Sequence, residues 1–487
     1  MIRSTGRIDH WLPTRSSEPV SPSTCERARH TMDEDRKYWD MNMEPFLNTP
    51  QMREVQFYKL RHALKQICER STYFQKKYRA AGITAENVDQ KIRSLEDYSR
   101  AIPIFTKEDY REHAAACNGD LIRLLSEELP ISVDELTLIN STTGTTGDPT
   151  PYPFTFRAIF EVWGEHLARG LWRAGARKRD RVLECFGLSM HIGGIATVMG
   201  LMRMELGVIP VGAETGADRI FQMAKHYKPT IFIGTPSLAS YLVDAAPQKI
   251  GIPAKEMGIR LLLCGGEPGP GVPEIRRKIE EGFGGVLIDH GGALGVSCTY
   301  PEYQGMHHLA DDYCLYELVD PDTHEPIPLE DGARGEAVLT PLMAGSLMPL
   351  RSTLGDIHEV RTSPCPCGGS GFRYKIVGRT DDMLKVKGVI VYPAAVAGVL
   401  ESFSPRVSGE FRIVLTEKPP RVEPPLKIKV EWGKEFPEEK LPDLEKELLE
   451  AFHSRIKIRP KIIWQAPGTF ERAMVKSKRF EKLYKED

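Results

Sequence analysis

Residues 140–150 read NSTTGTTGDPT and give the strongest local signal in this sequence. Six hydroxyl side chains and two glycines stand in this window. Glycines let the backbone turn and bring N–H groups close to phosphate oxygens, and hydroxyl groups add further donors. The window is not a Walker A loop, because Gly147 is followed by Asp148 instead of a lysine and a hydroxyl residue. A serine- and threonine-rich surface linker has a similar composition, so the surrounding sequence must decide between the two.

The sequence on both sides of this window indicates an α/β fold. Residues 35–90 combine strong helix formers with a mixed polar and apolar pattern, which predicts helices and a stop at Ala81-Gly82. From about residue 130 to residue 360, short apolar runs alternate with helical patterns, which is typical of parallel α/β layers. The expected strands are Arg181–Phe186, Gly207–Val211, Thr230–Gly234, Ile259–Cys264 and Gly285–Asp289. We therefore predict a large multi-layer α/β domain over residues 31–377.

The C-terminal part of the chain predicts a smaller α+β domain. Strands are expected at Phe411–Leu415, Leu426–Trp432 and Lys461–Trp464. Apolar residues recur at helical spacing over residues 438–456, so this segment is predicted to be an amphipathic helix. We assign residues 389–487 to this small domain, residues 378–388 to a hinge, and residues 1–30 to a flexible N-terminal arm.

The composition excludes several classes of protein. The 487 residues include 65 Lys+Arg and 67 Asp+Glu, and a net charge of −2 gives no electrostatic basis for binding nucleic acid. No run reaches the roughly 18 apolar residues of a membrane span, and the N-terminus lacks the apolar segment of a secretory signal. The nine cysteines are an odd number and mostly scattered, which argues against a disulfide framework and favours a reducing, cytoplasmic location.

Five motifs in a fixed order resemble the adenylate-forming superfamily of acyl-CoA synthetases, and in particular the phenylacetate–CoA ligases. The 140–150 window resembles the phosphate loop S-S-G-T-T-G-K-P, with Asp148 in place of the lysine. The other four are Gly265-Gly266-Glu267-Pro268, similar to G-A-E-P; Gly355-Asp356-Ile357, similar to T-G-D; GRTDDMLKVKG at 378–388, similar to the G-R-x-D-D hinge; and GTFERAMVKSKR at 468–479, similar to the ending P-R-S-x-G-K-A-x-R. Each motif alone has a plain structural explanation, but chance does not account well for five matches in order.

The resemblance implies a role for each matched residue. Lys476 would be the catalytic lysine and Asp381 the pivot of the hinge, and Lys387 and Gly388 would line the path of CoA. The residues expected to bind ATP and AMP are Thr142, Thr143, Gly144, Thr145, Thr146, Gly147, Gly266, Glu267, Pro268, Asp289, His290, Gly291, Asp356 and Arg379. Mg²⁺ is expected with ATP, although Ala293 and Leu294 stand where the family often has the Thr and Glu that position the metal.

These roles together imply an AMP-forming acid–CoA ligase. The carboxylate would attack the α-phosphate of ATP, and the thiol of CoA would then attack the acyl-adenylate after the small domain has rotated about Asp381. The resemblance also favours a homodimer. Two alternatives stay open. One is an adenylating enzyme that passes the acyl group to an amine or a carrier protein, and the other is a non-catalytic sensor of a nucleotide or acyl-adenylate.

The acid is expected to bind near Phe186, His191, Gly265 and His290. Phenylacetate ligases offer apolar and aromatic walls there, whereas this chain offers two histidines beside small residues. A neutral imidazole can hydrogen-bond a hydroxyl group or a carboxylate. We therefore favour a small hydroxylated or branched acid, similar to 2-hydroxyisobutyrate, and place an arylacetate second. Either histidine could instead be a packed residue with satisfied hydrogen bonds.

A structural zinc site is expected from Cys298, His307, Cys365 and Cys367. Three thiolates and one imidazole make a closed tetrahedral set that suits Zn²⁺. The spacing alone favours independent reduced cysteines, and His308 could replace His307. Some relatives of the phenylacetate–CoA ligases carry similar residues at matching places, which favours zinc.

Overall fold

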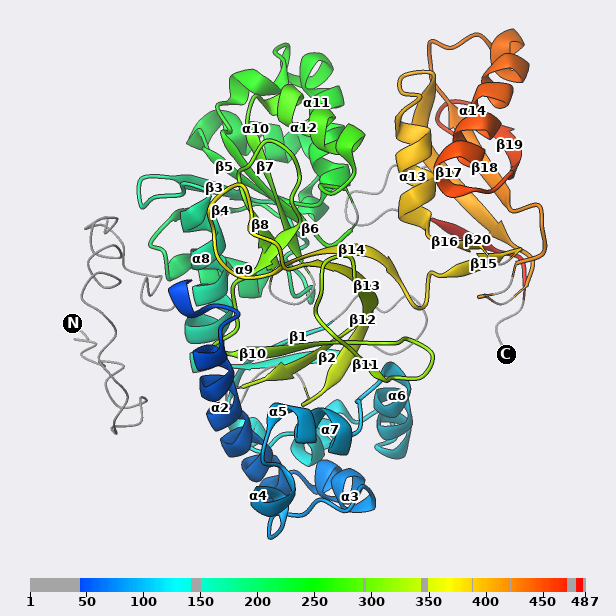
Figure 1. The fold of residues 1–487 in the computed structure, drawn as a ribbon. Coiled ribbons are helices and arrows are strands. Elements are labelled where there is room, and N and C mark those ends of the chain that lie inside the picture. The colour runs from blue at the N-terminus through cyan, green and yellow to red at the C-terminus, as the bar shows by residue number, and fades with distance from the viewer. Residues whose placement is uncertain are drawn as a thin grey trace.

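A twelve-stranded sheet runs through the larger part of the molecule, in the order β11-β10-β12-β13-β14-β9-β8-β7-β6-β5-β3-β4 (Figure 1). The computed structural model describes residues 44–141, 150–267, 269–291, 295–342, 349–387, 389–417, 419–420, 422–470 and 479–484. Several predictions therefore lie outside the described residues, namely the arm 1–30, Thr142–Gly147, Pro268, Gly388 and Lys476.

One half of this sheet is parallel, as the apolar runs predicted. Its strands are β3 (Arg181–Glu184), β4 (Gly207–Pro210), β5 (Ile231–Gly234), β6 (Leu261–Gly265) and β7 (Val286–Gly291). Each lies within one or two residues of the expected range. The predicted α/β fold class is thereby confirmed.

The other half is antiparallel, which the prediction of parallel layers up to residue 360 missed. Its strands are β8 (Gly295–Ser297), β9 (Met306–His308), β10 (Cys314–Val319), β11 (Pro326–Ile327), β12 (Arg334–Pro341), β13 (Ser352–Arg361) and β14 (Arg373–Arg379). The described residues between β8 and β14 contain no helix. Parallel neighbours usually need a helical crossover, and without such a helix these strands pair antiparallel.

Helices cover both faces of the parallel half. The π-helix Ala158–Trp163, α8 (Gly164–Arg173) and α9 (Ile195–Met202) lie on one face, and α10 (Ala217–Tyr227), α11 (Pro236–Ile250) and α12 (Pro273–Phe283) lie on the other. Successive strand residues alternate between the two faces, so Val182 packs with α8 and α9 while Leu183 packs with α10 to α12. Both faces are apolar because parallel sheets are buried on both sides.

The N-terminal third is helical, in agreement with the sequence pattern. It contains α2 (Pro50–Arg70), α3 (Thr72–Ala80), α4 (Val88–Lys91), α5 (Leu95–Ala101), α6 (Lys107–Ala116) and α7 (Leu121–Glu128). The predicted stop is present, because α3 ends at Ala80 and Gly82 takes a φ of +76°. An antiparallel hairpin of β1 (Leu136–Ser141) and β2 (Pro151–Thr155) then flanks the glycine-rich loop. Short 3₁₀ helices lie at Glu44–Phe46, Val133–Glu135, Ala213–Thr215, Ala254–Met257 and Glu438–Lys440.

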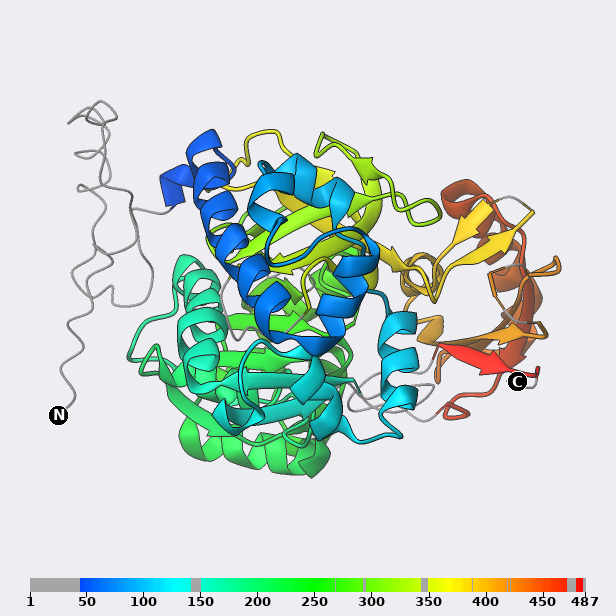
Figure 2. The same cartoon turned by 90° about the horizontal axis from the view of Figure 1, so that it is seen from below.

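The C-terminal part forms a smaller unit beside the larger one in both views (Figures 1 and 2). It contains the hairpin β15 (Leu384–Val386) and β16 (Val389–Val391), then α13 (Pro393–Glu401), β17 (Val407–Leu415), β18 (Lys427–Trp432), α14 (Leu441–Ile456), β19 (Lys461–Gln465) and β20 (Phe480–Lys482). The predicted strands and helix are confirmed. An apolar core of its own extends from Leu384 to Ile462, while Gly378 and Arg379 belong to β14 of the large sheet.

Two general features complete the fold. In the described part of the chain, none of the helices has the length and apolar character needed to span a bilayer. The eight cysteines among the described residues are all free of disulfide bonds.

Candidate active site

The residues expected to form an acyl pocket lie together at the carboxyl ends of the parallel strands, where open α/β sheets bind ligands. The rings of Phe186 and His191 stack with their centroids 6.2 Å apart. Gly265 lies opposite His290 in the register of β6 and β7. Gly266 connects the two pairs, because a Cβ built on it would lie 3.8 Å from the Phe186 ring. The structure therefore brings all four predicted residues into one group.

Gly265 is required by the close approach of two backbones. A Cβ atom at this position would lie 2.1 Å from the carbonyl oxygen of His290, far below any real contact. The same Cβ would lie 3.7 Å from Nδ1 of His290, so the imidazole stands beside the empty side-chain position. The glycine thus keeps one edge of the His290 ring clear of side-chain atoms.

The loop that carries His191 is tied to the strand that enters the glycine-rich loop. Asn140 Nδ2 donates to the carbonyl oxygen of His191 at 3.0 Å, and the N–H of Ser141 donates to the carbonyl oxygen of Met190 at 2.7 Å. Within its own loop, His191 Nδ1 accepts from the N–H of Gly193 at 3.0 Å. A nitrogen that accepts carries no proton, so the neutral His191 ring is protonated at Nε2.

His290 is half-buried and pairs with a second histidine. Its Nε2 atom lies 3.2 Å from Nε2 of His166, which is fully buried in α8. Burial lowers the pKa of His290 to about 4, and burial together with His290 and Arg169 lowers the pKa of His166 well below its ordinary value. Both rings are therefore neutral near pH 7.

Two residues predicted to bind the nucleotide have protein partners of their own. The carboxylate of Asp289 accepts a hydrogen bond from the Tyr303 hydroxyl, and burial raises its pKa to about 6. Glu267 Oε1 accepts from the N–H of Ser237 at 2.9 Å and so caps the first turn of α11. These contacts fix both side chains at the ends of β6 and β7.

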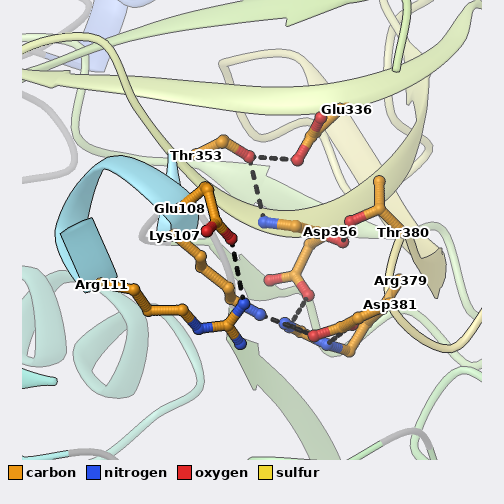
Figure 3. A network of polar contacts seen from close by, with 10 residues as sticks. Lys107, Glu108, Arg111, Glu336, Thr353, Asp356, Arg379, Thr380 and Asp381 are labelled. Carbon is orange, nitrogen blue, oxygen red and sulfur yellow. Dashed lines mark hydrogen bonds and ion pairs between the residues drawn. The ribbon is translucent and has the colours of Figure 1, made fainter. Parts of the chain in front are cut away.

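The predicted ribose pair and the predicted pivot form one charged network, which Figure 3 shows. Asp356 of β13 lies opposite Arg379 of β14 in the sheet register, and the guanidinium contacts the Asp356 carboxylate directly. Arg379 Nε also donates to Asp381 Oδ1 at 2.9 Å. From the other side, Lys107 at the start of α6 donates to Asp381 Oδ2 at 2.7 Å. Gly355, with a φ of +80°, makes the bend that presents Asp356 to this network.

The network shifts the acidity of its carboxyl groups in opposite directions. Burial raises the pKa of Asp356, although Arg379 and Lys107 oppose the shift. Burial acts on Asp381 in the same sense, but there Arg379 and Lys107 prevail and lower the pKa to about 2. Tyr152 of β2 lies close to this network, since both Asp356 and Arg379 influence its titration, but burial is the main cause that raises its pKa to about 12. Asp381 is therefore an anion at any physiological pH.

The four predicted zinc ligands converge, with their ligand atoms all within 4.8 Å of one another. Cys298 Sγ lies 3.9 Å from Cys365 Sγ, and Cys367 Sγ lies 3.5 Å from His307 Nε2. The other ring nitrogen of His307 is 2.8 Å from the carbonyl oxygen of Ser370, which orients Nε2 toward the thiols.

The alternative ligand His308 is excluded by its position. Its Nε2 lies 3.2 Å from Asp311 Oδ1, and its ring stacks on Phe372. Neighbouring residues of a strand point to opposite faces of a sheet, so His307 and His308 of β9 cannot both face the cysteines.

The remaining predicted residues lie near the ends of strands. Gly291 accepts a hydrogen bond from the Tyr374 hydroxyl at 2.9 Å. Lys387 occupies the turn between β15 and β16 with a φ of +48°. The phosphate-loop residues 142–147, Pro268, Gly388 and Lys476 lie outside the described residues.

Sequence reasoning missed Lys107, His166 and Trp163. Thr106 and Asp109 form a capping box that marks the start of α6, but Lys107 is 274 positions away from Asp381 in the sequence. Trp163 meets the ring of His290 edge-on, with centroids 6.2 Å apart. Nothing local in the sequence marks these residues, because their significance comes from contacts between distant segments.

Comparisons with known proteins agree with this geometry. The model of the AMP-binding enzyme family matches residues 63–340, and that of the AMP-binding enzyme C-terminal domain matches residues 388–482. The phenylacetate-coenzyme A ligase of Thermus thermophilus is 30% identical over 433 residues, which cover 87% of this chain and 92% of that protein.

Among solved structures, a 2-hydroxyisobutyryl-CoA ligase in the postadenylation state, in complex with 2-HIB-AMP, aligns with a TM-score of 0.80. The identity is 25%, and the alignment covers 93% of this chain and 94% of that chain. The same ligase with 2-HIB-AMP and CoA in the thioesterification state aligns with a TM-score of 0.65, at 26% identity and the same coverage.

Proposed function

The chain belongs to the AMP-binding enzyme family, and from this premise we propose that it activates a small hydroxylated carboxylic acid and transfers it to coenzyme A. The predicted relationship to the phenylacetate–CoA ligases is confirmed. The predicted class is confirmed with it, since this is an AMP-forming acid–thiol ligase that uses ATP and CoA. The identity of the acid and the assignment of roles to residues are our proposal.

The acid is proposed from one observation, which is the pair of imidazoles at the ends of the parallel strands. His191 and His290 stand in the same group as Phe186 and Gly265. A pocket with such polar groups discriminates strongly against an acid that leaves them without a partner. A small branched acid with a hydroxyl group, similar to 2-hydroxyisobutyrate, satisfies them better than phenylacetate, which is the second candidate.

In the first step, an oxygen of the substrate carboxylate would attack the α-phosphorus of ATP, and pyrophosphate would leave. Asp356 would accept hydrogen bonds from the ribose hydroxyls, and Arg379, which already pairs with it, would hold it in place. The phosphate loop and Lys476 would supply donors and a positive charge to the phosphate oxygens. Mg²⁺ would neutralise further phosphate charge, and we propose that it enters with ATP, because Ala293 and Leu294 carry no metal-binding group.

In the second step, the sulfur of CoA would attack the acyl carbon, and AMP would leave. We propose that the smaller unit rotates about Asp381 between the two steps, with Lys387 and Gly388 beside the incoming thiol. The two TM-scores support this, since one ligase in two states aligns at 0.80 and at 0.65 although its sequence is the same. The arrangement described above therefore resembles the state with bound adenylate more than the thioesterification state, and we propose that it precedes the rotation.

We further propose that Cys298, His307, Cys365 and Cys367 hold a structural zinc ion. The donor set fits, because three thiols and an imidazole nitrogen converge and the imidazole is oriented by a carbonyl oxygen. Cys365 and Cys367 lie in the connection between β13 and β14, the two strands that carry Asp356 and Arg379. Bound zinc would brace this connection. A cytoplasmic location and a homodimer remain part of the same proposal.

The decisive experiment is ATP–pyrophosphate exchange against a panel of hydroxy acids, arylacetates and benzoates, followed by thioester formation with CoA. Exchange with hydroxy acids together with thioester formation is the expected result. Exchange with pyrophosphate release but no dependence on CoA would favour transfer to an amine or a carrier protein. ATP binding without exchange for any acid would favour the sensor, which the residues Asp148, Ala293 and Leu294 suit.

A further inference from the structure

A second group of metal-binding side chains lies where α6 leads into α7, in the helical N-terminal part of the molecule (Figure 1). Its members are His113 of α6, Cys117 directly after that helix, and Glu127 of α7, and one ligand atom from each lies within 4.8 Å of the others. An imidazole nitrogen, a thiolate and a carboxylate oxygen are the ligands that Zn²⁺ takes in proteins. None of the three residues belongs to the candidate active site or to the proposed four-ligand zinc site.

The local fold brings these side chains together. His113 and Cys117 are four positions apart, and the N–H of Cys117 donates to the carbonyl oxygen of His113 at 3.0 Å, as in a continuing helix. Their side chains therefore project from the same side of the helix end. The short connection 118–120 leads into α7, whose last turn carries Glu127. Two consecutive helices thus supply all three ligands.

The imidazole of His113 is oriented from two sides. Its Nδ1 lies 2.8 Å from Oε1 of the buried Glu128, and its ring stacks on Tyr73 with centroids 4.0 Å apart. A histidine that binds a metal almost always donates its other N–H to a carboxylate, a carbonyl oxygen or water, which fixes the ring. Glu128 and Tyr73 therefore hold the ring with Nε2 directed at Glu127.

The carboxylate of Glu127 is oriented as well. Arg123, one turn earlier on α7, donates from Nε to Glu127 Oε1 at 2.9 Å, while Glu127 Oε2 lies 3.1 Å from His113 Nε2. In a tetrahedral zinc site, a nitrogen and an oxygen ligand lie about 3.3 Å apart, which the observed separation nearly matches. A protonated imidazole between two glutamates would also explain the two short distances, but it gives the thiol of Cys117 no part.

We infer that His113 Nε2, Cys117 Sγ and Glu127 Oε2 form a binding site for a zinc ion, with Glu128 as its outer carboxylate. Binding displaces the thiol proton and any proton on Nε2 to the solvent, while Nδ1 keeps its proton toward Glu128. The side chain of Glu127 is 29% exposed, so water can reach the fourth coordination position. With three protein ligands, the site is expected to bind more weakly than the four-ligand site and to fill only when metal is supplied.

The first experiment is equilibrium dialysis of the full-length protein against increasing Zn²⁺, followed by elemental analysis. One equivalent is expected beyond the content of the purified protein. Cys117→Ser and Glu127→Gln should each weaken its binding at least about tenfold, since even the loss of an outer partner costs that much. Cys68→Ser in the same core and Glu54→Gln on the exposed face of α2 are the controls. The inference is overturned if no further equivalent binds, or if either ligand variant binds it as tightly as the wild type.

The second experiment identifies the thiol. Co²⁺ replaces Zn²⁺ in such sites, and a thiolate bound to it gives an intense charge-transfer absorption. In the background Cys365→Ser/Cys367→Ser, added Co²⁺ is expected to produce this band, and Cys117→Ser should abolish it. Glu128→Gln keeps the ligands and should retain the band at about tenfold weaker affinity. Absence of the band would leave His113 as a plain ion pair, and a band undiminished in Cys117→Ser would come from another thiol; both overturn the inference. Neither experiment uses a substrate, so both are independent of the proposed function.

Discussion

Asp289 is a carboxyl group whose buried setting makes the stability of the protein depend on pH. Burial raises its pKa to about 6, above the ordinary 3.8, although Tyr303 and the His290 backbone oppose the shift. Because the folded pKa is the higher one, the contribution of Asp289 to stability is complete below pH 3.8 and is lost as the pH rises through 6.

Asp289→Asn should remove this dependence, since an amide does not ionise and still bonds Tyr303. Relative to the wild type, the variant is expected to gain about 1.5 kcal/mol of unfolding free energy between pH 5 and pH 8. Urea unfolding of both proteins at the two pH values measures the difference. Asp322→Asn, at an exposed carboxylate, is the matched control. The same difference between variant and wild type at both pH values would contradict this account of Asp289.

The cysteine cluster makes a prediction about metal content. One equivalent of zinc per chain is expected, and the double variant Cys365→Ser/Cys367→Ser should lose it, because two hydroxyls do not replace two thiolates. Loss of the metal should also lower the melting temperature, since bound metal stabilises the folded state. Elemental analysis of the purified protein measures the zinc. Cys68→Ser, in the core of the N-terminal helices, is the control, and an undiminished zinc content in the double variant would rule out the site.

At the scale of elements, the start of α6 contacts Asp381, the proposed pivot of the hinge. Lys107 donates to Asp381 at 2.7 Å, and both side chains are nearly half exposed. Exposed pairs of this kind contribute about 0.2–1 kcal/mol, which corresponds to a factor of about 1.4 to 5 in a population. Rotation about Asp381 would break the pair, so the contact favours the arrangement seen in the structure.

Lys107→Met should therefore shift the balance between the two half-reactions without abolishing either. Adenylate formation is expected to slow and thioester formation from supplied acyl-adenylate to hold or quicken, each by a few fold. Single-turnover measurements of pyrophosphate release and of thioester formation separate the two steps. Lys178→Met, which removes another exposed ion pair, is the control. Equal slowing of both steps would mean that Lys107 serves the fold and not the hinge.

The elements also show how far sequence reasoning reaches. The parallel strands were predictable because each is a short apolar run buried on both faces, as Leu183 and Val182 illustrate. The antiparallel half was not, because its strands carry buried polar residues such as Glu336 and His358, and because the register of β12 against β13 shifts between Glu336 and Val338. The motifs located Asp356 and Arg379 through local patterns. Lys107 and His166 have no such pattern, because their partners are distant in the sequence.

At the scale of the whole molecule, few ion pairs between described residues join the smaller unit to the larger one. Arg455 lies 3.5 Å from Glu274, and Lys385 lies 3.9 Å from Asp322. Both pairs are exposed on at least one side and contribute little. An interface of this kind permits large relative motion at small cost. The geometry is therefore compatible with one chain adopting two arrangements, as the proposed rotation about Asp381 requires.

Two variants, one aimed at adenylate formation and one at thioester formation, together test whether the smaller unit rotates between these two steps. Lys476→Ala should abolish adenylate formation, because the lysine cation proposed to meet the phosphate charge is then missing, and should spare thioester formation from supplied acyl-adenylate. Asp381→Pro should do the reverse, because proline fixes φ near −65° and prevents the rotation that admits CoA. Asp381→Ala, which loses the same ion pairs but keeps backbone freedom, separates rotation from charge. If the domain rotates between the two steps, only the proline variant stops after adenylate formation. A proline variant with wild-type thioester formation would show that Asp381 is not the pivot. Equal loss of both steps in Lys476→Ala would show that Lys476 does not act specifically in adenylate formation.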